Sequence, residues 1–485
     1  MKHILIICAL SFNCILCSQD TNAVKYANTI KIESLKLHLN KLASDQLEGR
    51  EAGRLGQRLA SKYIANMFES FGVKKIMDST YFQRFEFYES KLSKAFLTNG
   101  RDSLLLNKGL YMIPRYGIPE KKQLTTHTIV DFDSLKSLPD SLIKGKNYFS
   151  SIKKSQLSNG HEEIRRLFKK YIRAGASSII LSIDTIMGMA DYFIHQSEHS
   201  IVSLNTNQST ANQCLALICE TSALEKAFDF SIEHQFNKSI SFDLRLQFKS
   251  TKSSKIFFTE NVLGVVEFNK SSDEYIVLSA HYDHIGKKNG LIYNGADDDG
   301  SGTASIMVIA EALAKAKKDG IKLKRNFLFV GFTAEEKGLL GSRHYTDHPM
   351  IPLEHIVAGL NIDMVGRADT LDHKTDDYLY IIGSDMINKD LHDINEKANE
   401  DYSGLDLDYR FNNTDDPNQF YYRSDHYNFA KHDIPVIFYF RGVHEDYHKH
   451  TDTVDKILWD KLEKFSRHIF CTAWEIAKSP NMLTK

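Results

Sequence analysis

The stretch from Tyr275 to Gly302 constrains the fold of this chain more than any other. Residues 275–280 are apolar and rich in β-forming side chains, which predicts a buried strand. The strand runs into a His-Tyr-Asp sequence, and because side chains alternate along a strand, His281 and Asp283 should leave on the same face. A carboxylate beside a histidine can bind one ring nitrogen and direct the other at a metal ion. The end of this strand is therefore a candidate metal site.

An acidic triplet, Asp297-Asp298-Asp299, follows a polar loop and opens the amphipathic run 304–318. One side-chain oxygen satisfies a helix N-cap, so three consecutive carboxylates exceed what capping needs. An isolated triplet of this kind is usually a solvated turn. Its place directly behind a strand that ends in His-x-Asp favours a cation-binding role instead.

The composition excludes one class of function and bounds the number of domains. The chain has 485 residues, which is enough for two domains or one large domain with an insert. A hydrophobic content of 42% and a charged content of 25% are ordinary for a soluble globular protein. The net charge of -1 argues against a nucleic-acid partner, because such a surface needs a basic excess.

The first residues have the pattern of an export signal. Met-Lys-His is followed by an apolar run, residues 4–16, which is too short to span a bilayer. Cleavage is expected between Cys17 and Gln19, which makes residues 1–18 a signal peptide and the protein periplasmic or secreted. Cys14 or Cys17 could instead carry a lipid that anchors the chain to a membrane. We expect no transmembrane segment elsewhere, because no other stretch is long and apolar enough.

Strands and helices alternate from Asn261 to the C-terminus. The predicted strands are 262–268, 275–280, 326–332, 356–362, 378–382 and 435–440. The predicted helices are 304–318, 386–398 and 458–477, and apolar residues at helical spacing also mark 32–42 and 55–71. This order predicts an α/β fold, a mixed central sheet flanked by helices on both faces. Ligands of such folds gather at the carboxyl ends of strands.

Residues 99–252 have a different character, with short apolar strands between polar turns and no catalytic cluster of His, Asp, Glu or Cys. We interpret them as an inserted smaller domain of α+β or β class that carries no chemistry. Residues 19–98 and 253–485 would then form the catalytic domain. In the glycine-punctuated turn near residue 50, Glu48 and Arg50 could border an active site, but we interpret them as solvated loop charges.

Further polar clusters stand at or soon after the predicted strands, where their side chains could meet. A pair of divalent ions sharing a water needs imidazole and carboxylate ligands, one carboxylate bridging. Taken singly, a Glu-Glu pair is usually surface charge and a strand-end Asp is usually a cap. The prediction of a metal site depends on their occurrence together at the ends of successive strands. The candidate ligands are His281 and Asp363 for one ion, Glu336 and His448 for the other, and Asp298 between them.

These segments resemble the co-catalytic di-zinc peptidase family that includes bacterial leucyl aminopeptidase and glutamate carboxypeptidase. The resemblance covers residues 260–457 and, more loosely, 42–87, and it implies the zinc exopeptidase fold and two Zn²⁺ ions. Its ligand positions fall on His281, Glu336, Asp363 and His448, with Asp298 bridging and the peptide bond after Asp298 commonly cis. The insert resembles the protease-associated domain found in such enzymes.

The same resemblance assigns roles around the metal ions. Glu335, the first of the glutamate pair, would be the general base, and Asp283 would orient His281 from outside the ligand set. Tyr447 would donate to the oxyanion, although a purely packing aromatic is an equal alternative. His450 competes with His448 as the last ligand. His284, His426 and His444 are expected to lie outside the ligand set or on the surface.

The function implied by the resemblance is that of an exported zinc-dependent exopeptidase acting on peptide substrates, most simply an aminopeptidase that releases N-terminal residues. A carboxypeptidase or dipeptidase of the same family stays open. A glutaminyl cyclase shares the fold, but such enzymes work with one zinc ion and keep a smaller ligand set. The remaining alternative is a binding relative whose peptidase domain has lost its activity, although no ligand or base is missing here.

Overall fold

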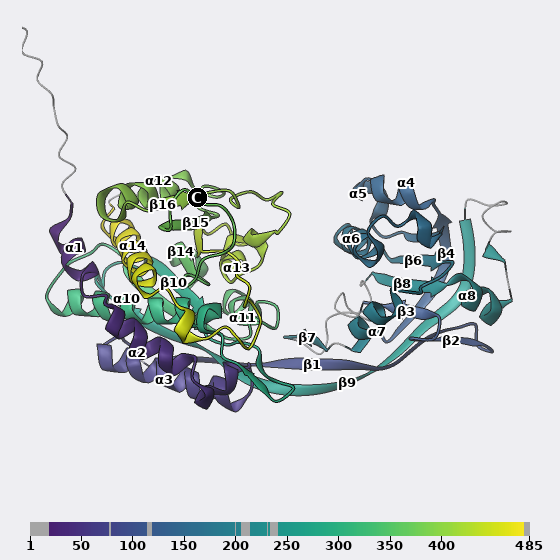
Figure 1. Ribbon diagram of the computed structural model, residues 1–485, viewed down its shortest axis with the longest axis horizontal. Helices are drawn as coiled ribbons and strands as arrows, with labels where there is room; N and C mark the ends of the chain where they lie inside the picture. Colours follow the sequence, from purple (N-terminus) through teal and green to yellow (C-terminus); the bar gives the residue numbers. More distant parts are fainter. Residues whose placement is uncertain are drawn as a thin grey trace, which may run out of the picture. The chain divides into compact units, whose positions relative to one another are not determined.

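The chain divides into two compact units, described here from a computed structural model (Figure 1). The first unit extends to Phe85 and resumes at Phe258, and the second runs from Glu86 to Phe257. The structure describes residues 19–76, 79–113, 119–198, 200–204, 214–229, 231–232 and 241–479. The predicted signal peptide and its candidate lipid-bearing cysteines lie outside these residues. In the described ranges, no helix combines the length and apolar character that crossing a bilayer requires.

A mixed sheet forms the centre of the first unit, in the strand order β16-β15-β17-β14-β10-β13-β9. The strands are β10 (Tyr275–His281), β13 (Asn326–Phe332), β14 (Ile356–Ile362), β15 (Tyr378–Ile382), β16 (Asp406–Asp408), β17 (Val436–Phe440) and the last part of β9 (Ser241–Val266), from Phe258 on. The neighbours β17, β14, β10 and β13 run parallel, whereas β15 and β9 pair antiparallel to β17 and β13. The carboxyl ends of the four parallel strands therefore meet at one edge of the sheet.

Helices cover both faces of this sheet, as the alternation of strands and helices predicted (Figure 1). One face packs against α1 (Thr21–Ala27), α2 (Ile32–Leu42), α3 (Leu55–Phe71), α10 (Gly302–Lys318), α12 (Lys389–Ala398) and α14 (Trp459–Lys478). The other face packs against α11 (Leu340–Asp347) and α13 (His426–Ala430). Successive residues of β10 serve the two faces, since Ile276 and Leu278 join the first core and Val277 the second.

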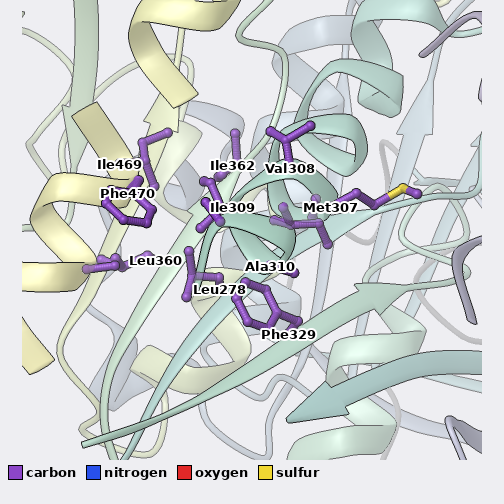
Figure 2. Close-up of a cluster of buried hydrophobic side chains, with 14 of the residues drawn as sticks. Leu278, Met307, Val308, Ile309, Ala310, Phe329, Leu360, Ile362, Ile469 and Phe470 are labelled. Atoms are coloured by element: carbon purple, nitrogen blue, oxygen red, sulfur yellow. The ribbon is translucent and has the colours of Figure 1, made fainter. Parts of the chain in front are cut away.

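The core of the first face lies directly behind the candidate site. Figure 2 shows Leu278, Phe329 and Leu360, from β10, β13 and β14, together with Ile309 of α10 and Phe470 of α14. Each of these side chains is fully buried, and burial of such a side chain contributes about 1.5–3 kcal/mol. This packing fixes α10 against the strands, and α10 begins where the acidic triplet ends.

The second unit has an α/β arrangement of its own, and the predicted insert, 99–252, lies within it. Strands β4 (Lys121–Ile129), β5 (Asn147–Ile152), β6 (Ser178–Ile183) and β8 (Leu215–Glu220) are parallel, and β3 (Leu110–Met112) pairs antiparallel to β8. Its helices are α4 (Phe132–Ser137), α5 (Asp140–Ile143), α6 (Gly160–Arg173), α7 (Ala190–Glu198) and α8 (Thr221–Phe228). Two apolar cores lie on the two faces of this sheet.

Candidate active site

The donor side chains come from the common carboxyl edge of the parallel strands. His281 is the last residue of β10, Glu335 and Glu336 follow β13, and Asp363 follows β14. His448 lies in the loop after β17. Asp298 belongs to the short helical segment Ala296–Ser301 that leads into α10. Because these strands are neighbours in the sheet, residues far apart in the chain meet here.

Two groups of donor atoms face each other across Asp298. On one side, the His281 Nε2 atom lies 3.3 Å from Asp298 Oδ1 and 3.5 Å from Asp363 Oδ1. On the other side, the His448 Nε2 atom lies 3.2 Å from both Asp298 Oδ2 and Glu336 Oε2. Asp298 thus presents one oxygen to each group. The five candidate ligands predicted from the sequence come together in this arrangement.

The other two carboxylates of the acidic triplet are turned away from these groups and bind main-chain amides. Asp299 accepts hydrogen bonds from the amides of His281, Gly302 and Met364, at 3.1, 2.9 and 3.2 Å. Asp297 accepts one from the Gly366 amide at 2.6 Å. The outer two carboxylates of the triplet therefore hold the backbone, and only the middle one, Asp298, faces both His281 and His448.

Two further contacts hold candidate ligands in place. The Asp452 carboxylate accepts hydrogen bonds from the amides of Asp297 and Asp298, and the peptide bond between Asp298 and Asp299 is cis. The cis bond is the one that the resemblance implied. On the opposite side, the Ser424 hydroxyl donates to Asp363 Oδ2 at 2.7 Å, which leaves Asp363 Oδ1 free to face His281.

Glu335 lies beside the first group of donors. One of its oxygens, Oε2, is 3.8 Å from His281 Nε2, and its amide donates to Asp283 Oδ1 at 3.1 Å. Burial raises the pKa of the Glu335 carboxyl well above its ordinary value, against the opposing effect of the His281 charge. A carboxyl group with a raised pKa can accept and return a proton near neutral pH.

Asp283 contacts His281 mainly through its main chain. The His281 Nδ1 atom lies 3.1 Å from the Asp283 carbonyl oxygen and 3.9 Å from the carboxylate Oδ1. A hydrogen bond at Nδ1 leaves Nε2 as the nitrogen that faces Asp298 and Asp363. Burial raises the pKa of Asp283 to about 6.

A pocket beside the donor groups is lined largely by apolar side chains. Its apolar lining is Met364, Phe420, Phe438, Phe440 and Val443. Tyr447 and Arg423 line the same pocket, and the Arg423 guanidinium donates to the Tyr447 hydroxyl at 3.3 Å. The Tyr447 ring stacks on His448, with ring centroids 3.9 Å apart.

The remaining histidines near the site differ in what they contact. The ring of His450 packs edge-on against Tyr293, with ring centroids 6.2 Å apart, whereas His448 is the histidine that contacts Asp298 and Glu336. His426 stacks on Phe438, and burial lowers its pKa to about 3. His284 is fully buried, with Nδ1 only 2.9 Å from Glu336 Oε1.

Comparison with known proteins assigns this part of the chain to a family. Residues 261–473 match the sequence profile of peptidase family M28. This segment is an M28 peptidase domain. A probable glutamate carboxypeptidase of Arabidopsis thaliana is 38% identical over 105 residues, which make up 21% of this chain and 14% of the relative. Aminopeptidase YwaD of Bacillus subtilis is 33% identical over 112 residues, 23% of this chain and 22% of the relative. The matches thus span less than a quarter of these relatives' lengths.

Solved structures share the fold over most of the chain. An aminopeptidase from Aneurinibacillus sp. strain AM-1 has a TM-score of 0.52 at 19% identity and covers 95% of this chain and 97% of its own. A zinc aminopeptidase from Bacillus subtilis has a TM-score of 0.51 at 18% identity and covers 93% and 96%. The predicted zinc exopeptidase fold is confirmed.

The interpretation of Arg50 as a solvated loop charge is wrong, because this residue helps to hold the candidate site together. Arg50 is fully buried. Its guanidinium donates to the carbonyl oxygens of Tyr282 at 2.7 Å and Gly295 at 2.8 Å, and also to those of Leu42 and Asn294, each at 2.6 Å. These bonds tie the loop after His281 to the residues just before the acidic triplet. The Arg50 charge is held among carboxylates that include Asp283 and Asp452.

Proposed function

We propose that this chain is a zinc-dependent exopeptidase, an aminopeptidase that uses two Zn²⁺ ions to remove N-terminal residues from peptides. The observation that supports this most directly is Asp298, whose two carboxylate oxygens face two separate sets of imidazole and carboxylate donors. Such a shared carboxylate is what a pair of divalent ions needs. We further propose that residues 1–18 direct export, because of the apolar run 4–16.

The donor set fits zinc, which takes imidazole nitrogens and carboxylate oxygens. Three buried oxygens that lack a hydrogen-bond partner among the described residues are suited to bind cations: Asp298 Oδ2, Glu336 Oε1 and Asp363 Oδ1. His281 and Asp363 would hold one ion, and Glu336 and His448 the other, with Asp298 between them. Zinc at these positions supplies Lewis acidity, which lowers the pKa of a water molecule and polarises the scissile carbonyl.

Glu335 is the proposed general base. Its carboxylate takes a proton from the attacking water and returns it to the leaving amine, a role suited to its raised pKa. The Asp283 side chain holds the Glu335 amide, and its carbonyl oxygen holds His281 Nδ1. Asp283 thereby positions both the base and a proposed ligand.

Tyr447 is the proposed donor to the oxyanion. Tyr447 lines the pocket, and its hydroxyl keeps its proton, because burial raises the pKa of the phenol and the charges of Asp298 and Glu336 raise it further. A neutral phenol can donate a hydrogen bond to the oxygen on which negative charge develops. Arg423 steadies the hydroxyl by donating to its oxygen.

The pocket also bears on the choice of substrate. Its phenylalanine, methionine and valine lining suits an apolar side chain. The carboxylates of Glu335 and Asp363, which also line the pocket, favour an N-terminal ammonium group. One observation favours a second candidate, a carboxypeptidase. Arg423 brings a guanidinium to the pocket, and guanidinium groups bind carboxylates bidentately.

A substrate panel separates these candidates. We expect leucyl- and phenylalanyl-nitroanilide with free amines to be hydrolysed, and their N-acetylated forms to show a kcat/KM lower by about 10²-fold or more, because an ammonium-binding site rejects the blocked amine. Hydrolysis confined to N-acylated dipeptides with a free carboxylate would instead show a carboxypeptidase. Conversion of N-terminal glutamine to its cyclic product would show a cyclase. Failure on the whole panel would leave only a binding role.

A further inference from the structure

His284 is placed like a metal ligand although the proposed ligand set does not contain it. The residue lies in the loop after β10 and is fully buried. Its Nδ1 atom lies 2.9 Å from Glu336 Oε1 and 3.9 Å from Asp298 Oδ2. Among the described residues, neither ring nitrogen of His284 has a hydrogen-bond partner, and Glu336 Oε1 has none either. A buried imidazole without partners requires an explanation.

The separations of His284 from Glu336 and Asp298 are compatible with ligands of one shared ion. Zinc–ligand bonds of about 2.0–2.2 Å in a tetrahedron place neighbouring donor atoms about 3.3 Å apart. His448 lies 3.2 Å from both Asp298 Oδ2 and Glu336 Oε2, and the two His284 distances fall on either side of that value. His284, Asp298 and Glu336 form one of the donor groups in the described residues that are close enough to hold an ion together.

The backbone is shaped to accommodate this ring. Gly295 has a φ of 55°, and a Cβ atom at this position would lie 2.5 Å from Cγ and Cδ2 of His284. Only glycine fits so close to the imidazole in that left-handed conformation. The Arg50 carbonyl accepts a hydrogen bond from the His284 amide at 3.4 Å, so the residue is held on its main-chain side as well.

We propose that His284 is a further protein ligand, through Nδ1, of the zinc ion assigned to Glu336 and His448. This inference rests on the proposed two-zinc function. It makes the two positions unequal, because one has four protein ligands, His284, Glu336, His448 and Asp298. The other has three, His281, Asp363 and Asp298. A site with four protein ligands is closed, whereas a site with three keeps a position open for water or substrate.

The zinc position that keeps a place open for water or substrate is then the one beside Glu335, the proposed base. Glu335 Oε2 is 3.8 Å from His281 Nε2, and Glu335, His281 and Asp363 form the second donor group. The closed position serves chiefly to hold Asp298 and Glu336 in place. It follows that the two zinc ions should leave the protein at different chelator concentrations.

Zinc affinity in His284→Ala tests the proposal, with His450→Ala as the matched control from the same region. Measured by competition with a chelator, one of the two zinc ions in His284→Ala should bind more weakly by about 100-fold or more, beyond the 10–100-fold typical for loss of a residue outside the ligand set. His450→Ala should keep both wild-type affinities. Circular dichroism confirms that each variant is folded. Wild-type affinity for both ions in His284→Ala would overturn the proposal.

A crystal structure of the zinc-loaded wild-type chain provides a second test that needs no variant. We expect His284 Nδ1 within about 2.2 Å of the zinc ion beside Glu336. A ring more than 3 Å from that ion and hydrogen-bonded to Glu336 would also overturn it, yet would leave the two-zinc function intact. Failure of the wild-type chain to bind a zinc pair would instead contradict the proposed function itself.

Discussion

Replacing Glu335 by alanine is expected to lower kcat/KM for peptide hydrolysis by about 10²–10⁴-fold. The physical reason is that no other described carboxylate combines its position, 3.8 Å from His281 Nε2, with freedom from the predicted ligand set. Zinc content should be unchanged, because Glu335 lies beside the proposed ligands without being one. Steady-state kinetics with a nitroanilide substrate and metal analysis of the same sample measure both quantities.

Glu445→Ala is the control for this variant, since Glu445 is an exposed glutamate on the loop that carries Tyr447. It should retain kcat/KM within about two-fold, in line with the small effects of most surface substitutions. Hydrolysis by Glu335→Ala within a few-fold of wild type, with zinc retained, would eliminate Glu335 as the base. Parallel losses of zinc and activity would indicate a ligand instead.

Replacing Arg50 by methionine is expected to lower the free energy of unfolding by about 3–5 kcal/mol. Methionine keeps the buried apolar stem but removes the donors to the carbonyls of Leu42, Tyr282, Asn294 and Gly295. It also leaves the surrounding carboxylates, among them Asp283, without their buried counter-charge. Urea unfolding monitored by circular dichroism measures the loss, and zinc affinity should fall with it.

The matched control is Arg58→Met, in which an exposed arginine that donates to the Gly53 carbonyl is replaced. Its effect should stay within about 0.5 kcal/mol, as for most surface substitutions. An Arg50→Met chain as stable as Arg58→Met would show that the buried guanidinium does not hold the loops together.

Regular elements with strong periodicity were predictable from the sequence. The ranges 32–42 and 55–71 are helices α2 and α3 to the residue, because their apolar side chains recur at helical spacing. Strands 326–332, 356–362 and 378–382 also agree with the structure. Strand 262–268 was only partly right, since β9 begins at Ser241. The polar middle of β9 has little apolar alternation, and pairing with β4 supports its first part.

The convergence of donors was predictable for a topological reason. His281, Glu336 and Asp363 each follow a strand, and parallel neighbours bring their carboxyl ends to one edge. The structural role of Arg50 was not recognised, because nothing local in the sequence marks it. The Tyr282 carbonyl that Arg50 binds is 232 residues away in the chain. The close approach of Gly295 to the His284 ring is likewise a contact that a single sequence does not reveal.

The central claim of the proposed function is that two zinc ions share Asp298. The most direct test adds zinc stepwise to the metal-free chain. The bound zinc per chain and the rate of peptide hydrolysis are measured at each step. We expect hydrolysis to reach its maximum only when two zinc ions are bound per chain, and to disappear when a chelator removes them. Full activity at one zinc ion per chain, or activity that survives complete removal of metal, would contradict it.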